Sequence, residues 1–155
     1  MNLRIVRRLE QRYAELGKND LLPVLPGAAQ LLRDLDGNPS RARLTHLDPR
    51  RQNVRVTGGQ PPSIFDWSNA LGAAPEMEIA RIEEYAAIDE NGLDYEAFLE
   101  GYSRAGGTVV SETPAWPILR LDRAVMLAVV FSTVAPNDQL RELFLTRVKT
   151  LAKQL

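Results

Sequence analysis

Most of the chain repeats apolar side chains three or four positions apart, the spacing of one face of an α-helix. The first such stretch runs from Leu3 to Leu16 and ends at Gly17, a residue suited to a helix C-terminus. A connector over residues 21–27 leads to a second, from Ala28 to Leu35, which Gly37 and Pro39 end. Further helices are expected over residues 75–88, 95–107, 114–134 and 136–155. The pattern therefore predicts a mainly α protein.

The period changes between residues 41 and 66, where short extended segments replace helix. Arg41 to Thr45 reads as one short strand. Asn53 to Val56 and Ser63 to Phe65 alternate on either side of the segment 57–62, which contains two glycines and two prolines. Such a segment is typical of a tight turn. We therefore expect a small β-hairpin within the helical protein.

Length and composition favour one soluble domain over residues 1–155, since a chain of 155 residues is long enough for one core. The 19 basic and 20 acidic side chains nearly cancel, so no overall field favours nucleic acid or an anionic membrane as a partner. The absence of cysteine excludes disulfides, thiolate metal sites and catalytic cysteine chemistry. The longest apolar run, within residues 124–134, is much shorter than the roughly 20 residues that span a bilayer. We expect a cytoplasmic protein that binds neither nucleic acid nor membrane.

Candidate chemistry lies around the predicted hairpin, where Asp48, Asn53 and Asp66 follow one another. Phosphoryl transfer needs a carboxylate that positions the attacking hydroxyl and hard oxygen ligands that hold magnesium against the phosphates. These three residues supply such groups. Arg50 and Arg51 lie in the same loop, where a guanidinium could pair with a phosphate oxygen.

Each of these residues also has a purely structural interpretation. His46, the only histidine, could brace a loop through one ring hydrogen bond. Asp48 and Asp66 could cap turns beside Pro49 and Ser68. Arg50 and Arg51 could form a solvated pair of charges, and Trp67 is expected in the core.

Several segments together resemble the aminoglycoside phosphotransferase and choline kinase-like family, and specifically its helical C-terminal lobe. The resemblance runs from about Leu22 to the C-terminus, and no single segment carries it alone. Its strongest segments are Leu44-Thr45-His46-Leu47-Asp48, Asn53-Val54, Ile64-Phe65-Asp66-Trp67, Gly72-Ala73-Ala74-Pro75-Glu76-Met77-Glu78-Ile79-Ala80 and Phe98-Leu99-Glu100-Gly101-Tyr102.

The resemblance implies a role for each matching residue. Asp48 corresponds to the catalytic base, and Asn53 and Asp66 correspond to ligands of Mg²⁺ bound with ATP. His46 corresponds to the residue that braces the catalytic loop, and Glu78 to a structural anchor. The implied fold is a kinase-like C-lobe, with catalytic and metal loops over about 41–68 and a helical remainder over 75–155.

The chain also departs from the family. The loop reads Pro49-Arg50-Arg51-Gln52 where the family usually has a glycine just before the asparagine. The three lysines, Lys18, Lys149 and Lys153, lie outside any strand pattern that could reach phosphates. We therefore expect the N-terminal nucleotide lobe to be absent.

The resemblance and these departures leave two possible functions. The first is a truncated or split phosphotransferase that acts on a small-molecule hydroxyl. The second is a non-catalytic kinase-like module that binds a partner or serves as a scaffold. In either case the face left by the missing lobe would be covered by a second copy or by a partner protein.

Overall fold

A computed structural model describes residues 2–17, 25–36, 42–88, 93–108 and 113–155. The chain divides into two compact units. Unit 1 comprises residues 1–39 and 113–155, and unit 2 comprises residues 40–112. The prediction of a single domain over residues 1–155 stays a prediction.

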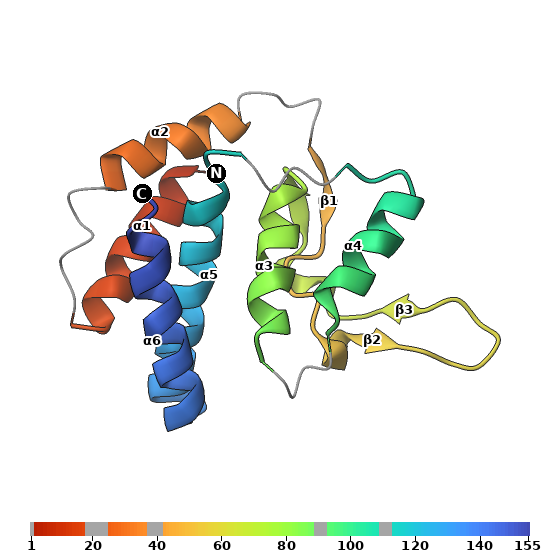
Figure 1. The fold of residues 1–155 in the computed structure, drawn as a ribbon. Helices are drawn as coiled ribbons and strands as arrows, with labels where there is room; N and C mark the ends of the chain where they lie inside the picture. Colours follow the sequence, from red (N-terminus) through yellow and green to blue (C-terminus); the bar gives the residue numbers. More distant parts are fainter. Residues whose placement is uncertain (1, 18–24, 37–41, 89–92, 109–112) are drawn as a thin grey trace. The chain divides into compact units, whose positions relative to one another are not determined.

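Unit 1 is entirely helical in its described part. Helix α5 packs against α1 and α6, and α2 packs against α1 (Figure 1). Its elements are α1 (Asn2–Glu15), α2 (Leu25–Asp36), α5 (Trp116–Val129), the π-helical η6 (Val130–Val134) and α6 (Asp138–Ala152).

The apolar faces of these helices form the core of unit 1, as the helical periodicity predicts. Fully buried side chains include Leu9, Ile118, Val125 and Phe144. An ion pair joins α1 to α5 at the edge of this core, where Nε and Nη2 of Arg8 contact the Asp122 carboxylate at 3.0 and 2.6 Å.

Unit 2 combines two helices with two small antiparallel sheets in its described residues. Strand β1 pairs with β4, and β2 pairs with β3. The elements are β1 (Arg43–Thr45), the 3-10 turn η3 (Arg51–Asn53), β2 (Val54–Arg55), β3 (Ser63–Ile64), the 3-10 turn η4 (Trp67–Asn69), β4 (Leu71–Ala73), α3 (Glu76–Ala86) and α4 (Tyr95–Arg104).

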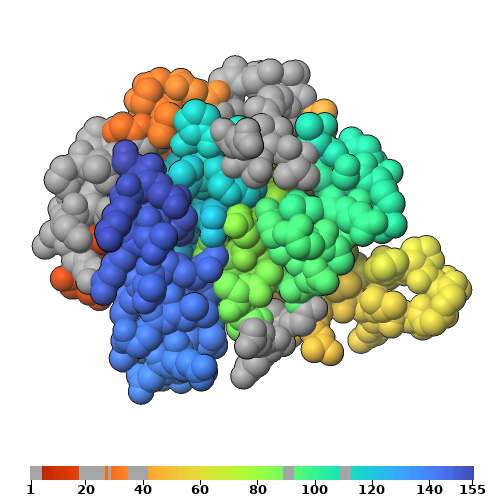
Figure 2. Space-filling view, viewed as in Figure 1, coloured from red at the N-terminus to blue at the C-terminus, as the bar shows by residue number. Residues whose placement is uncertain are grey.

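The β2–β3 hairpin protrudes from unit 2 (Figures 1 and 2). Its turn is closed by a hydrogen bond from the Gln60 N–H to the Thr57 carbonyl at 3.0 Å. Gly59 has a φ of 76°, a conformation that glycine adopts without a steric penalty. The predicted hairpin is confirmed.

The fold class is confirmed as mainly α with small β elements. Strand β4 was not expected. It pairs with β1, so the described residues contain a second sheet besides the predicted hairpin. The connector was predicted to reach Gly27, but α2 begins at Leu25. Pro26 fits there because the first turn of a helix needs no donor from that residue. Residues 18–24, 37–41 and 89–92 lie outside the described part, so the predicted helix stop at Gly37 and Pro39 and the first residues of the predicted strand are not tested.

Trp67 was expected in the core, and this prediction is wrong because 47% of the residue is exposed. Its indole N–H donates to the Ile64 carbonyl at 2.9 Å. Among the described residues, no helix has both the length and the apolar character needed to cross a membrane.

Candidate active site around Asp48

The Asp48 carboxylate is buried and accepts hydrogen bonds on both oxygens. Oδ1 accepts from the Tyr85 hydroxyl at 2.5 Å. Oδ2 accepts from the Asn53 amide at 3.2 Å and from Arg50, whose Nε and Nη2 lie 3.1 and 2.9 Å away. An ionised carboxylate can accept all of these bonds, and the Arg50 charge compensates it at close range.

The segment that carries Asp48 is held by the ring of His46. Nδ1 accepts from the Asp48 backbone N–H at 3.3 Å, and Nε2 lies 2.7 Å from the Phe65 carbonyl. Because a carbonyl oxygen can only accept, Nε2 carries the ring proton. The ring therefore ties the Asp48 loop to the end of the hairpin. It also packs against Trp67 in a T-shaped arrangement, with 4.8 Å between ring centroids.

Asn53 and Asp66 flank the hairpin at its open end. Asn53 is the last residue of η3, directly before β2, and Asp66 lies between β3 and η4. The Phe65 N–H donates to the Asn53 carbonyl at 2.8 Å, so the residue before Asp66 is bonded to Asn53. The Asn53 side-chain nitrogen donates to the Asp48 carbonyl at 2.9 Å as well as to its carboxylate. On the Asn53 side chain, only the amide oxygen therefore has the chemistry to bind a cation.

Asp66 differs from Asp48 because it is exposed. It has a φ of 60° and lies at the start of η4. The Ser68 hydroxyl donates to its Oδ1 at 2.6 Å. This hydrogen bond, together with a second one from the Ser68 backbone, lowers the pKa of Asp66 below its ordinary value of 3.8. Asp66 is therefore an ionised carboxylate open to solvent at neutral pH.

Helix α3 contacts the same loop from the side of unit 2's core. Glu78 Oε1 accepts from the backbone N–H groups of His46 and Leu47 at 3.0 and 3.3 Å. Arg81 donates to the Leu47 carbonyl at 2.6 Å. The position of Glu78 fits the structural anchor that the resemblance implies.

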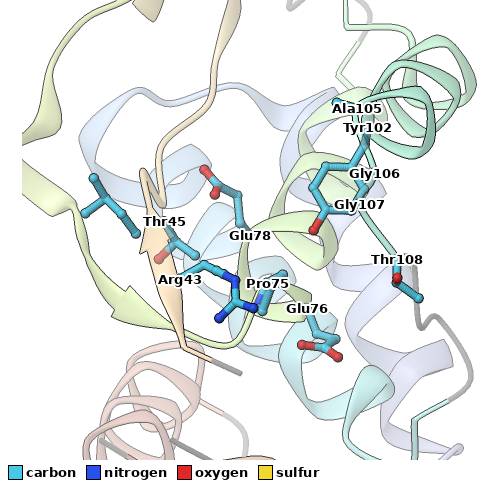
Figure 3. Close-up of a pocket in the computed structure, with 11 residues that line it drawn as sticks. Arg43, Thr45, Pro75, Glu76, Glu78, Tyr102, Ala105, Gly106, Gly107 and Thr108 are labelled. Atoms are coloured by element: carbon cyan, nitrogen blue, oxygen red, sulfur yellow. The ribbon is translucent and has the colours of Figure 1, made fainter. Parts of the chain in front are cut away.

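A separate cavity of about 750 Å³ lies between β1, the start of α3 and the end of α4 (Figure 3). Its lining includes Arg43, Thr45, Glu76, Glu78 and Tyr102, and none of Asp48, Asn53 and Asp66. Glu78 therefore lies between this cavity and the Asp48 loop.

The structure brings three of the predicted site residues into direct contact: Asp48, Arg50 and Asn53. Asp66 joins them through the hairpin, whereas Arg51 is exposed on η3. Arg50 was predicted to contact a phosphate, and in the structure it pairs with Asp48. The sequence reasoning missed Tyr85 and Arg81, and it named Ser68 only as the neighbour of Asp66 in a possible turn cap. Only Ser68 had a local signal, since a serine two residues after an aspartate commonly bonds to it.

Comparison with known proteins identifies the family. The sequence model described as the phosphotransferase enzyme family (APH) matches residues 2–121. The chain belongs to the phosphotransferase enzyme family. No curated protein and no solved structure matches. The predicted family is confirmed, and the match includes α1, which precedes the predicted start of the resemblance near Leu22.

The polar residues around Asp48 suit a metal that is shared with a ligand. The described residues hold no group of three histidine, cysteine or acidic side chains that could bind a metal alone. Mg²⁺, however, is commonly held by one or two carboxylates together with substrate phosphates and water. The Asp66 carboxylate and the Asn53 amide oxygen fit that arrangement.

Proposed function

We propose that this protein transfers the γ-phosphate of ATP to a hydroxyl group of a small molecule. The observation that carries the proposal is the arrangement around Asp48. Three side chains orient the buried carboxylate of Asp48. The exposed, ionised carboxylate of Asp66 follows Phe65, whose N–H donates to the carbonyl of Asn53. Membership of the phosphotransferase enzyme family supports the same chemistry.

In this proposal Asp48 orients the acceptor hydroxyl and accepts its proton as the phosphate bond forms. Mg²⁺ bound with the nucleotide would neutralise the phosphate charge, held by Asp66 and the Asn53 amide oxygen.

Arg50 would exchange partners when the nucleotide binds. Its side chain is 41% exposed, whereas that of Asp48 is 11% exposed, so Arg50 can move toward solvent while Asp48 stays in place. A guanidinium pairs well with phosphate oxygens. Release of Arg50 would open Oδ2 of Asp48 to the acceptor, and Arg51 on η3 would offer a second positive charge to the phosphates.

We further propose that the surface of a second copy or of a partner protein covers the exposed apolar side chains of the β2–β3 hairpin and the turn after it. Val56, Ile64, Phe65 and Trp67 are all at least 45% exposed. Exposed apolar side chains gathered in one segment favour protein contact. Unit 2 contains no lysine, so contacts that a lysine makes to phosphates in related kinases would come from such a surface. A purely scaffolding role would use the same face without nucleotide.

The test is calorimetric titration with Mg²⁺ and ATP of the wild type, Asp66→Ala and the control Asp138→Ala, which removes an exposed aspartate from unit 1. We expect binding heat in the wild type and the control, and at least a tenfold loss of affinity in Asp66→Ala. Equal affinities for Mg²⁺ and ATP in all three proteins would contradict the role of Asp66 as a metal ligand. No heat in any of them would show that the chain alone binds no nucleotide, and would leave either binding completed by the covering protein surface or the scaffolding role.

The chemical step is tested by ³¹P NMR of ATP turnover, with water as the acceptor. Asp48→Asn keeps the size of the side chain but cannot accept a proton. We expect ATP binding within a few-fold of wild type and loss of ADP formation by about 10²-fold or more. Unchanged turnover in Asp48→Asn would contradict the role of Asp48 as the base.

A further inference from the structure

One face of α3 holds the loop of Asp48 at three successive points. Glu78, Arg81 and Tyr85 are spaced i, i+3 and i+7, so they lie on the same side of the helix. Glu78 accepts from the His46 and Leu47 N–H groups, Arg81 donates to the Leu47 carbonyl, and Tyr85 donates to the Asp48 side chain. The contacts thus follow the loop in chain order, from backbone to carboxylate.

The loop conformation needs this support. Leu47 is buried and has a φ of 62°, in the left-handed region that bulky residues avoid. Both of its backbone polar groups are bonded to α3. Helix α3 therefore maintains the unfavourable turn that immediately precedes Asp48.

Tyr85 differs from the other side chains that contact the Asp48 carboxylate. Asn53 and Arg50 come from the same loop as Asp48, and both bond to Oδ2. Tyr85 comes from α3, is 3% exposed and bonds to Oδ1. Its hydroxyl thus fixes one oxygen of the carboxylate to a rigid element.

The two oxygens therefore have different surroundings. Oδ1 faces a buried phenol on a helix, and Oδ2 faces Arg50, whose side chain is partly in solvent. A molecule that approaches from solvent reaches Oδ2 once Arg50 moves aside, while Oδ1 keeps its partner.

We propose that Tyr85 is a positioning residue that sets the orientation of the Asp48 carboxylate and directs Oδ2 to the acceptor hydroxyl. The proposal rests on the proposed function of Asp48 as the base. It assigns to α3 a role in the reaction, although Tyr85 itself touches neither acceptor nor nucleotide.

The test variant is Tyr85→Phe, which keeps the ring and removes only the hydroxyl. The control is Tyr102→Phe, which removes a hydroxyl from α4 of the same unit, where the ring stacks on Phe98. The first measurement needs no nucleotide. NMR couplings to the β-protons of Asp48 report whether the χ1 torsion, which places the carboxylate, holds one rotamer. We expect one rotamer in the wild type and the control, and averaging in Tyr85→Phe.

The second measurement separates kcat from KM in the ³¹P assay. We expect Tyr85→Phe to lower kcat by about 10-fold to 100-fold and to leave KM for ATP within twofold, because Tyr85 does not touch the nucleotide. A single unchanged Asp48 rotamer in Tyr85→Phe would overturn the proposal, and so would an unchanged kcat beside an averaged rotamer. Wild type that turns over no ATP would count against the proposed function, whereas the rotamer experiment decides separately whether Tyr85 orients Asp48.

A third measurement uses the wild type alone, in case Tyr85→Phe does not fold. The Tyr85 hydroxyl proton should exchange slowly with water and give a nuclear Overhauser effect to the β-protons of Asp48. An exchange rate equal to that of the Tyr102 hydroxyl would overturn the proposal.

Discussion

His46 Nε2 lies 2.7 Å from the carbonyl oxygen of Phe65, 19 residues further along the chain. This bond joins the loop before Asp48 to the end of the hairpin that carries Asp66. The other ring nitrogen accepts from the Asp48 N–H. One buried ring therefore fixes the separation of the two loops that supply the proposed base and the proposed metal ligand.

Replacement of His46 by alanine should destabilise the protein. His46→Ala leaves the Phe65 carbonyl and the Asp48 N–H without their partner, and such losses cost about 1–3 kcal/mol for each buried group. We expect the free energy of unfolding in urea to fall by about 2 kcal/mol or more. Gln52→Ala, an exposed change in η3, serves as the control and should stay within about 0.5 kcal/mol of wild type. Equal stability of the two variants would contradict the bracing role.

The lowered pKa of Asp66 predicts a pH effect that depends on Ser68. A carboxyl whose folded pKa is below its unfolded value stabilises the protein above the unfolded pKa, here near 3.8. That stabilisation disappears as the pH falls through the folded pKa. Ser68→Ala removes the main cause, so it should raise the pKa of Asp66 toward 3.8 and make stability less sensitive to pH in this acidic range.

The measurement is a ¹³C NMR titration of the Asp66 carboxyl carbon between pH 2 and pH 6. Ser63→Ala removes a hydroxyl from the neighbouring strand β3 and should leave the pKa of Asp66 at its wild-type value. An identical midpoint for Asp66 in the wild type and Ser68→Ala would show that another group lowers its pKa.

Much of the fold could be predicted because helices are local. Periodic apolar residues, a glycine at the end of α1 and a proline in the first turn of α5 each act over a few positions. Strand β4 could not be predicted in this way. It is three residues long, has Gly72 at its centre and exists through its pairing with β1, whose residues lie 26 to 30 positions earlier.

The candidate site was predictable to the extent that its residues are close in sequence. Asp48, Arg50 and Asn53 lie within six positions, and a small hairpin returns the chain to Asp66. Tyr85 contacts Asp48 across 37 positions, and in α3 it fits the helical apolar pattern as an ordinary core residue. Its chemical role depends on the tertiary fold, which periodicity does not describe.

Two glycines of the α4 region should respond oppositely to alanine. A Cβ atom at Gly107 would lie 2.3 Å from the Tyr102 ring, whereas a Cβ atom at Gly101 would meet nothing within 4 Å. Gly107→Ala forces the ring away from its stacking on Phe98, and we expect a loss of about 1–3 kcal/mol. Gly101→Ala lies inside α4 and should stabilise the protein by up to about 1 kcal/mol.

Urea unfolding of both variants tests this contrast, and a second background identifies its cause. In Tyr102→Ala the ring is absent, so Gly107→Ala should then cost less than half of its original effect. An unchanged cost in that background would place the strain in the backbone near Gly106 and not in contact with the ring.

The ion pair between Arg8 and Asp122 should contribute more to stability than an exposed pair in the same unit. Arg8 contacts the carboxylate with two nitrogens, and the Asp122 side chain is only 7% exposed. Removal of one partner of a buried pair leaves an uncompensated charge, whereas exposed pairs contribute about 0–1 kcal/mol. The 33% exposure of the Arg8 side chain reduces the effect by solvent screening.

We therefore expect Arg8→Met to lower the free energy of unfolding by about 2 kcal/mol, between the buried and exposed limits. The matched control is Arg141→Met on α6. Its partners Asp138 and Glu142 have side chains that are 91% and 66% exposed, so the loss should be below about 1 kcal/mol. Addition of Asp122→Leu to Arg8→Met should recover part of the loss, because the buried charge is then gone. If the double variant is no more stable than Arg8→Met, the cost comes from lost packing of the arginine stem and not from the charge that it leaves behind.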